Sequence, residues 1–259
     1  MRSARAETLH AETWGEGDPL VLIHGFTQSA RTWRGLAAAV ATHHQLIALD
    51  APGHGRSSEV VADLPGGADL MAAAAPNPAA WLGYSMGGRY ALHVALRHPH
   101  LVERLVVVSA SGGIDDASER EARRRSDEAL ARKVEEEGVE SFVRWWLERP
   151  LFSTLSAGAA DIESRLDGTA AGLSSSLRNA GAGTQEPQWE QLGELTMPVL
   201  VVAGEMDAKY VGQAGRLVSA IGPNSELVVI PGSGHACHME RTNEFWTAVA
   251  PFLDRAGAN

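Results

Sequence analysis

The stretch Gly83-Tyr84-Ser85-Met86-Gly87-Gly88 decides the fold, because it sets a serine among glycines between two predicted elements. Ala80-Trp81-Leu82 before it indicates a short strand, and the apolar pattern from Gly87 to Arg97 predicts a helix. A G-x-S-x-G sequence at such a turn is typical of a nucleophile elbow, which exposes the serine oxygen at a sheet edge. So short a pattern also arises by chance in a glycine-rich chain, and its context favours the elbow.

Five longer apolar runs have the length and bounds of buried parallel strands. They are Leu20–Ile23, Gln45–Leu49, Leu105–Val108, Val199–Val202 and Leu227–Ile230. Helical patterns lie between strands, at Arg31–Ala41, Gly87–Arg97 and Val211–Ile221. Alternating strands and helices predict an α/β fold with a mostly parallel central sheet flanked by helices.

The segment from about residue 115 to 187 breaks this alternation. It contains no convincing strand, and it opens with a highly charged helical stretch, Ser118–Glu137. We interpret residues 1–259 as a single domain in which this segment is an inserted helical cap over the ends of the strands. No internal repeat or linker divides the chain.

A serine elbow needs a base and an orienting acid, because a serine hydroxyl alone is a poor nucleophile or base. Asp207 follows the predicted strand Val199–Val202, and His235 follows Leu227–Ile230. The order Ser, Asp, His is that of the α/β-hydrolase triad, and ligands gather at the carboxyl ends of parallel strands. Asp207 alone is also typical of a surface turn, and His235 alone of a loop, but together with Ser85 they predict a catalytic triad.

An oxyanion hole is predicted beside the elbow. The small residue in His24-Gly25-Phe26 lets a backbone amide approach a substrate oxygen, so we expect the amides of Phe26 and Met86 to form the hole. His24 itself is interpreted as structural, and Asp50 and His54, in the turn-rich loop after the next strand, as scaffold.

Composition excludes several classes of protein. The 259 residues carry a net charge of −10, and only two of the 22 basic residues are lysines. An acidic chain argues against nucleic-acid and membrane partners, and its single cysteine excludes a disulfide scaffold. No targeting segment or membrane span is visible, so we expect a cytoplasmic protein. No metal-ligating cluster stands out, and we expect no metal and no cofactor.

These motifs resemble the α/β-hydrolase superfamily over essentially the whole chain. The cap stretches 122–127 and 146–152, with residues 83–89, 204–209 and 234–238, resemble more specifically the 2-succinyl-6-hydroxy-2,4-cyclohexadiene-1-carboxylate synthases of menaquinone biosynthesis. One departure is a shorter chain between Ser57 and Gly83, where Pro76-Asn77-Pro78 interrupts the helical pattern and puts the flank of the sheet in doubt.

The resemblance implies a lyase that eliminates pyruvate from a substrate with three carboxylates. Ser85, activated by His235, would be the general base, Asp207 would orient the imidazole, and the Phe26 and Met86 amides would stabilise the enolate. Five positions match the family's substrate pocket: Tyr84, Arg89, Arg123, Trp146 and Arg165. Guanidinium groups suit carboxylates because they offer paired donors.

Other interpretations of the same residues stay open. Arg123 could lie on a solvated helix face, Trp146 could pack in a core, and Arg165 could be an exposed charge. An ester or carbon–carbon-bond hydrolase would use the same triad with Ser85 as nucleophile. A catalytically idle binding module is a third possibility, against which the intact triad argues.

Overall fold

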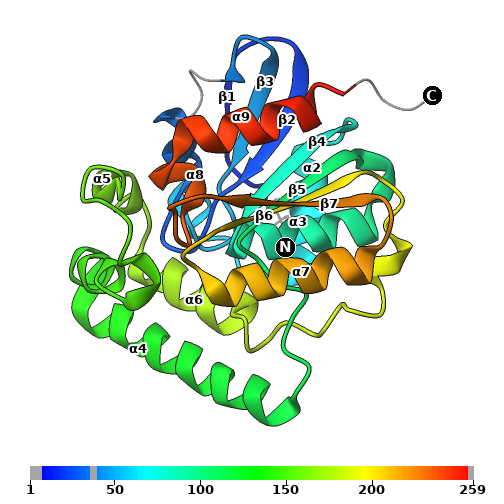
Figure 1. Ribbon diagram of the computed structural model, residues 1–259. Helices are drawn as coiled ribbons and strands as arrows, with labels where there is room; N and C mark the ends of the chain where they lie inside the picture. Colours follow the sequence, from blue (N-terminus) through cyan, green and yellow to red (C-terminus); the bar gives the residue numbers. More distant parts are fainter. Residues whose placement is uncertain (1–7, 36–39, 256–259) are drawn as a thin grey trace, which may run out of the picture.

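Seven strands form one sheet in the computed structural model, which describes residues 8–35 and 40–255 (Figure 1). Their spatial order is β1-β3-β2-β4-β5-β6-β7; β1 runs antiparallel to β3, and every other pair of neighbours is parallel. The strands are β1 (Ala11–Trp14), β2 (Asp18–Ile23), β3 (His44–Leu49), β4 (Ala79–Tyr84), β5 (Val102–Val108), β6 (Val199–Gly204) and β7 (Ser225–Ile230). The predicted α/β class with a mostly parallel sheet is therefore confirmed.

Apolar runs in the sequence mark six of the seven strands, but the run 227–230 is not the buried strand expected, because β7 lies at the edge of the sheet and exposes Leu227 and Val229. All six predicted strands are present, and the short run at Ala80 is part of β4, in which every residue is buried. Strand β1 was not predicted, because at the edge of the sheet its residues alternate between exposed and half-buried positions and form no apolar run.

Helices cover both faces of the sheet (Figure 1). Helices α2 (Leu64–Ala74), α3 (Met86–Arg97) and α7 (Ala208–Ile221) pack on one core, which includes Val21, Trp81 and Val107. Helix α9 (Thr242–Leu253), preceded by the short α8 (Cys237–Glu240), packs on the other, which includes Leu22, Leu82 and Val108. Neighbouring residues of one strand thus enter opposite cores, as the pleat of a strand requires.

One predicted helix begins differently from the sequence pattern, and one expected helix interruption is absent. The predicted helix 31–41 begins as the 3-10 helix η1 (Ala30–Trp33), and residues 36–39 lie outside the described residues. Helix α2 ends at Ala74, before Pro76, so Pro76-Asn77-Pro78 is the connection to β4 and does not interrupt a helix. Strand β4, which follows this connection, pairs with β2 and β5, so the shorter chain before Gly83 does not disturb the sheet.

Between β5 and β6 the chain forms helices and turns only, as the sequence predicts for this segment. Its elements are α4 (Ala117–Leu147), η4 (Pro150–Phe152), α5 (Ile162–Arg165), α6 (Ala170–Ala180) and η5 (Leu192–Glu194). Helix α4 runs ten residues past the predicted end at Glu137, although Gly138 has a φ of 78° and marks a kink inside it. We call residues 115–187 the cap.

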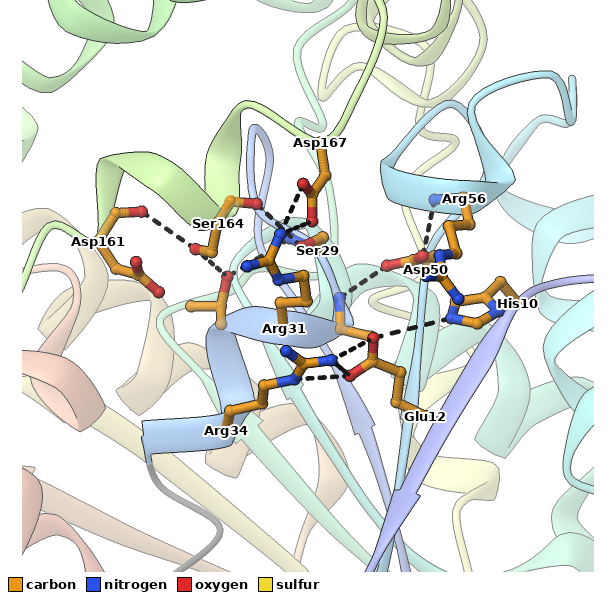
Figure 2. A network of polar contacts seen from close by, with 12 residues as sticks. His10, Glu12, Ser29, Arg31, Arg34, Asp50, Arg56, Asp161, Ser164 and Asp167 are labelled. Atoms are coloured by element: carbon orange, nitrogen blue, oxygen red, sulfur yellow. Dashed lines mark hydrogen bonds and ion pairs between the residues drawn. The ribbon is translucent and has the colours of Figure 1, made fainter.

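The cap is fastened to the loop after β2, as Figure 2 shows. Arg31 of η1 donates to both carboxylate oxygens of Asp167 at 2.7 Å. The Ser29 hydroxyl donates to the carbonyl of Ser164 at 3.0 Å. The cap is thus held close to the carboxyl ends of the strands.

Two further 3-10 helices connect elements of the sheet layer. The second 3-10 helix, η2 (Gly55–Ser57), follows β3, and η3 (Pro99–Leu101) links α3 to β5.

Among the described residues, no helix is both long enough and apolar enough to cross a lipid bilayer.

Candidate active site

Ser85 lies in a sharp turn between β4 and α3. Its φ of 53° falls in a region that costs a residue with a side chain of order 1–3 kcal/mol, which surrounding contacts must offset. The Ser85 N–H donates to the carbonyl of Val108 at 2.8 Å. A Cβ at Gly83 would lie 2.2 Å from the carbonyl oxygen of Gly87, so the flanking glycines are required for this turn.

Ser85, His235 and Asp207 form a connected chain of hydrogen bonds. The His235 Nε2 lies 3.0 Å from Ser85 Oγ, and its Nδ1 lies 2.8 Å from Asp207 Oδ2. Because an ionised carboxylate only accepts, Nδ1 carries the proton, and Nε2 is left to accept the proton of the serine hydroxyl. The structure thus brings together the three residues predicted from sequence, in a geometry that suits base or nucleophilic catalysis.

Each member of this triad is placed at the carboxyl end of a strand. Asp207 follows β6 and caps α7, since its side chain accepts the N–H of Tyr210 at 3.3 Å. His235 follows β7 and is 2% exposed. Cys237, the only cysteine of the chain, begins α8 and is fully buried, and burial raises the pKa of its thiol to about 12.

Phe26 and Met86 flank Ser85 in the wall of one cavity. Met86 is the first residue of α3, so its N–H lies in the helical turn that has no intrahelical acceptor. The N–H groups on either side of Phe26 are committed elsewhere, that of Gly25 to Gln28 Oε1 at 2.8 Å and that of Thr27 to His54 Nε2 at 3.4 Å. This placement fits the predicted oxyanion hole, whose role stays a prediction.

Two buried histidines hold the loop of Phe26, which we call the oxyanion loop (residues 24–28). The His24 Nε2 accepts the N–H of Ala51 at 3.1 Å, and its Nδ1 donates to the carbonyl of Gly25 at 2.8 Å. The His54 Nδ1 donates to the carbonyl of Pro52 at 3.0 Å. Burial lowers the pKa of His24 to about 4 and, with the His24 charge as a second cause, that of His54 to about 3.

Asp50 completes this framework with two backbone contacts, which Figure 2 shows. Its carboxylate accepts the N–H of Ala30 at 2.7 Å and that of Arg56 at 2.8 Å. The structural roles expected for His24, Asp50 and His54 are therefore confirmed.

The cavity above the triad has a volume of about 400 Å³ and lies between the sheet and the cap. Four cationic side chains lie in its wall, namely Arg89, Arg123, Arg149 and Lys209. Asp127 is the one acidic residue among the described lining residues, and it accepts from Arg123 Nε at 2.8 Å and from the N–H of Gly183 at 3.0 Å. The cavity therefore carries a positive charge inside a net-negative chain.

Arg89 differs from Arg123 in that no carboxylate in the described part of the chain neutralises its charge. It donates from Nη1 to the carbonyl of Ala180 at 2.8 Å, and no carboxylate of the described residues forms an ion pair with it. Burial and the nearby Arg123 charge lower its pKa, but an arginine stays protonated at neutral pH. A half-buried cation without an acidic partner favours an anionic ligand.

Three of the five predicted substrate residues line the cavity: Arg89, Arg123 and Trp146. Tyr84 does not. Its ring is buried behind the triad, with its centroid 5.4 Å from that of His235 and 4.3 Å from that of His238.

Arg165, the fifth, is also absent from the cavity wall. It is 3% exposed and donates from Nε to the carbonyl of Ala160 and from Nη1 to Thr27 Oγ1, both at 2.7 Å. Burial lowers its pKa to about 10. The structure therefore places Arg165 against the oxyanion loop and outside the described cavity wall, and its direct contact with substrate stays a prediction.

Sequence reasoning missed the contributions of Arg149, Lys209 and Tyr210 to the cavity wall. Lys209 and Tyr210 lie two and three residues after Asp207, so their position in the first turn of α7 could have indicated them. Arg149 follows two tryptophans at the end of α4, and only the packing of the cap brings it to the cavity. No group of three or more His, Cys, Asp or Glu side chains in the described part of the chain is arranged to hold a metal ion.

Residues 20–249 match the sequence profile described as the Alpha/beta hydrolase family. A 2-succinyl-6-hydroxy-2,4-cyclohexadiene-1-carboxylate synthase of Serratia proteamaculans is 30% identical, over 94% of this chain and 96% of its own. A pimeloyl-[acyl-carrier protein] methyl ester esterase of Yersinia enterocolitica is 32% identical, over 93% and 96%. The solved structure of MenH from S. aureus is 30% identical and superimposes with a TM-score of 0.87, over 94% and 97%. The chain is thus similar to enzymes of two activities, and it belongs to the alpha/beta hydrolase family.

Proposed function

We propose that the protein is a 2-succinyl-6-hydroxy-2,4-cyclohexadiene-1-carboxylate synthase. It would eliminate pyruvate from 2-succinyl-5-enolpyruvyl-6-hydroxy-3-cyclohexene-1-carboxylate. The observation that carries the proposal is the Arg89 guanidinium, which lines the cavity of Ser85 and has no acidic partner among the described residues. A substrate with three carboxylates suits such a cavity, whereas a neutral ester leaves its cations unpaired.

In the proposed reaction, Ser85 and His235 act together as the base. Ser85 Oγ, whose own proton passes to His235 Nε2 at 3.0 Å, takes the proton at C2 beside the succinyl carbonyl. The C2–H electrons form the C2=C3 bond, the ring double bond moves to C4=C5, and the C5–O bond breaks. The departing enolate of pyruvate takes up a proton and becomes pyruvate.

The protein groups around the triad would stabilise the charge that develops. Proton removal at C2 places negative charge on the succinyl carbonyl oxygen, where the N–H groups of Phe26 and Met86 would donate to it. Asp207 keeps the imidazole of His235 in the tautomer that accepts at Nε2 and would stabilise the imidazolium that forms when Ser85 gives up its proton. Trp146, Arg89 and Arg123 would bind the ring and its carboxylates.

Ester hydrolysis is the second candidate function, because the same triad serves a serine nucleophile and an esterase name occurs among the relatives. In that reaction Ser85 Oγ would attack the ester carbonyl, expel the alcohol and form an acyl-enzyme that water hydrolyses. The four cations of the cavity favour the elimination.

Supplying the enolpyruvyl substrate and measuring pyruvate release tests the proposal, beside hydrolysis of a simple aryl ester. We expect pyruvate release that Ser85→Ala lowers by about 10³-fold or more, as in other serine triads. Ser126→Ala, which removes another cavity serine, is the matched control and should change the rate little. Rapid ester turnover without pyruvate would reject the synthase in favour of the hydrolase.

The natural ligand in this proposal is a small, multiply anionic molecule. The net charge of −10 disfavours nucleic acid and anionic membranes as partners. We also propose a cytoplasmic location, which the single, buried cysteine fits.

A further inference from the structure

Two residues at and just beyond the end of α4 line the cavity, and each has a buried nitrogen donor without a partner in the described part of the chain. Trp146 Nε1 and Arg149 Nε are both buried, and neither has a hydrogen-bond partner among the described residues. Both residues line the cavity that contains Ser85. Buried donors are normally paired, so two unpaired donors in residues that line one cavity, three residues apart, point to a ligand that supplies an acceptor.

The backbone explains why Arg149 can face a ligand. Glu148 caps the helix, and Arg149 has φ −68° and ψ 149°, the extended conformation that the following Pro150 favours. Helix α4 therefore ends at Leu147, two residues before Arg149. Its cation also lies at the helix C-terminus, where the carbonyl groups of α4 favour positive charge.

Trp145 fixes the guanidinium of Arg149. The guanidinium carbon lies 4.3 Å from the centroid of the Trp145 ring, within the range of a cation–π contact. Lys133 Nζ lies 4.6 Å from the same centroid and also pairs with Glu137. Arg149, by contrast, has no acidic partner in the described residues, so its charge is available to a ligand.

We propose that Arg149 and Trp146 form a carboxylate subsite, separate from Arg89 and Arg123. A carboxylate suits both donors, because it only accepts hydrogen bonds and it neutralises the guanidinium. If the synthase function holds, the subsite binds one of the three substrate carboxylates and takes the place expected for Arg165. The identity of that ligand rests on the proposed function, whereas the subsite itself requires only a carboxylate.

Binding of tricarballylate, a flexible tricarboxylate, tests the subsite without catalysis. In calorimetric titrations of the full chain, we expect Arg149→Gln to weaken binding about 10-fold and Trp146→Phe to weaken it several-fold. The trimethyl ester should bind weakly to every protein and show no such dependence. Equal affinity of the wild type and Arg149→Gln, or no binding of tricarballylate by the wild type, would overturn the subsite.

Two matched variants separate ligand binding from packing. Arg144→Gln removes an exposed arginine of the same helix that pairs with Glu140. Lys133→Gln removes the other cation over Trp145 without touching the cavity wall. Both should bind tricarballylate within about twofold of the wild type. If Lys133→Gln weakens binding as much as Arg149→Gln, Arg149 acts through Trp145 and the proposal is wrong.

Kinetics with the enolpyruvyl substrate then distinguish the two proposals. We expect Arg149→Gln to raise KM about 10-fold and Arg149→Lys to restore part of the loss. Pyruvate release with an unchanged KM in Arg149→Gln would reject the subsite and keep the synthase. Arg149-dependent tricarballylate binding without pyruvate release would reject the synthase and keep the subsite.

Discussion

Arg165 and Thr27 join the cap to the oxyanion loop: Arg165 Nη1 of α5 donates to Thr27 Oγ1 at 2.7 Å. Thr27 has a φ of 67°, a conformation that needs support from outside the loop. It follows Phe26, whose amide we expect to stabilise the enolate. A residue of the cap thus helps to set the position of a group expected to act in the transition state.

Replacing Arg165 should therefore lower kcat more than it raises KM. We expect Arg165→Ala to reduce kcat about 10-fold or more, since the loss of an oxyanion donor costs 10²–10³-fold and a displaced loop loses part of that. Arg165→Lys should recover part of the activity. Steady-state kinetics of pyruvate release measure the split, and an increase in KM at constant kcat would instead return Arg165 to the group of substrate ligands.

Asp207→Asn should leave the fold intact and lower kcat by about 10³–10⁴-fold, because the amide no longer holds His235 in the tautomer that accepts from Ser85. The chain offers a matched control in a second pair, His44 Nε2 and Asp254 Oδ1 at 3.2 Å, remote from the cavity. Asp254→Asn should retain full turnover. Comparable losses in both variants would argue that Asp207 acts through stability alone.

Arg89→Gln should raise KM for the anionic substrate by about 10–100-fold, because a charge-assisted pair is worth about 1.5–3 kcal/mol. Arg97→Gln is the control on the same helix, since Arg97 is exposed and pairs with Asp69. The same two variants should hydrolyse a neutral aryl ester alike, if any ester activity exists. An unchanged KM in Arg89→Gln would remove the observation on which the proposed function rests.

The buried histidines predict a loss of stability in weak acid. His24 has a pKa of about 4 when folded and an ordinary pKa near 6.5 when unfolded, so below pH 6.5 the unfolded chain binds the extra proton. Its contribution is complete above pH 6.5 and declines as the pH falls towards 4, by about 2 kcal/mol between pH 7 and 5. Urea unfolding at a series of pH values measures this slope.

The variants for this measurement are His24→Asn and, as control, the exposed His100→Asn. His24→Asn should unfold at lower urea at pH 7 and show a shallower dependence on pH than the wild type. His100→Asn should follow the wild type throughout. An identical slope in His24→Asn and the wild type would show that His24 is not the titrating group.

The three triad residues could be predicted because each is marked by a local sequence pattern and the strand topology brings them together. Ser85, Asp207 and His235 each follow an apolar run, and parallel strands bring their carboxyl ends to one edge. Strand β1 escaped prediction because a half-exposed edge strand needs no apolar run. Its pairing with β3 comes from tertiary contact, which the sequence pattern does not contain.

The contacts of the cap arginines could not be predicted from the sequence. Arg123, Arg149 and Arg165 all lie in its helices or at their ends, and their sequence neighbourhoods do not distinguish them. Packing sends Arg165 to Thr27 and leaves Arg149 at the cavity, because the distances between helices α4 and α5 and the sheet decide what each side chain reaches. A motif therefore predicts that a residue matters more readily than it predicts which atom it touches.

Cys237 gives the chain a built-in chemical reporter. It is the only thiol, it is fully buried, and it lies two residues from His235. A thiol reagent can reach Cys237 only when the side chains packed behind the triad move apart. The labelling rate under native conditions therefore measures how often this local opening occurs. The dynamics of the surroundings of His235 can thus be followed in the unmodified protein, without a probe introduced by mutation.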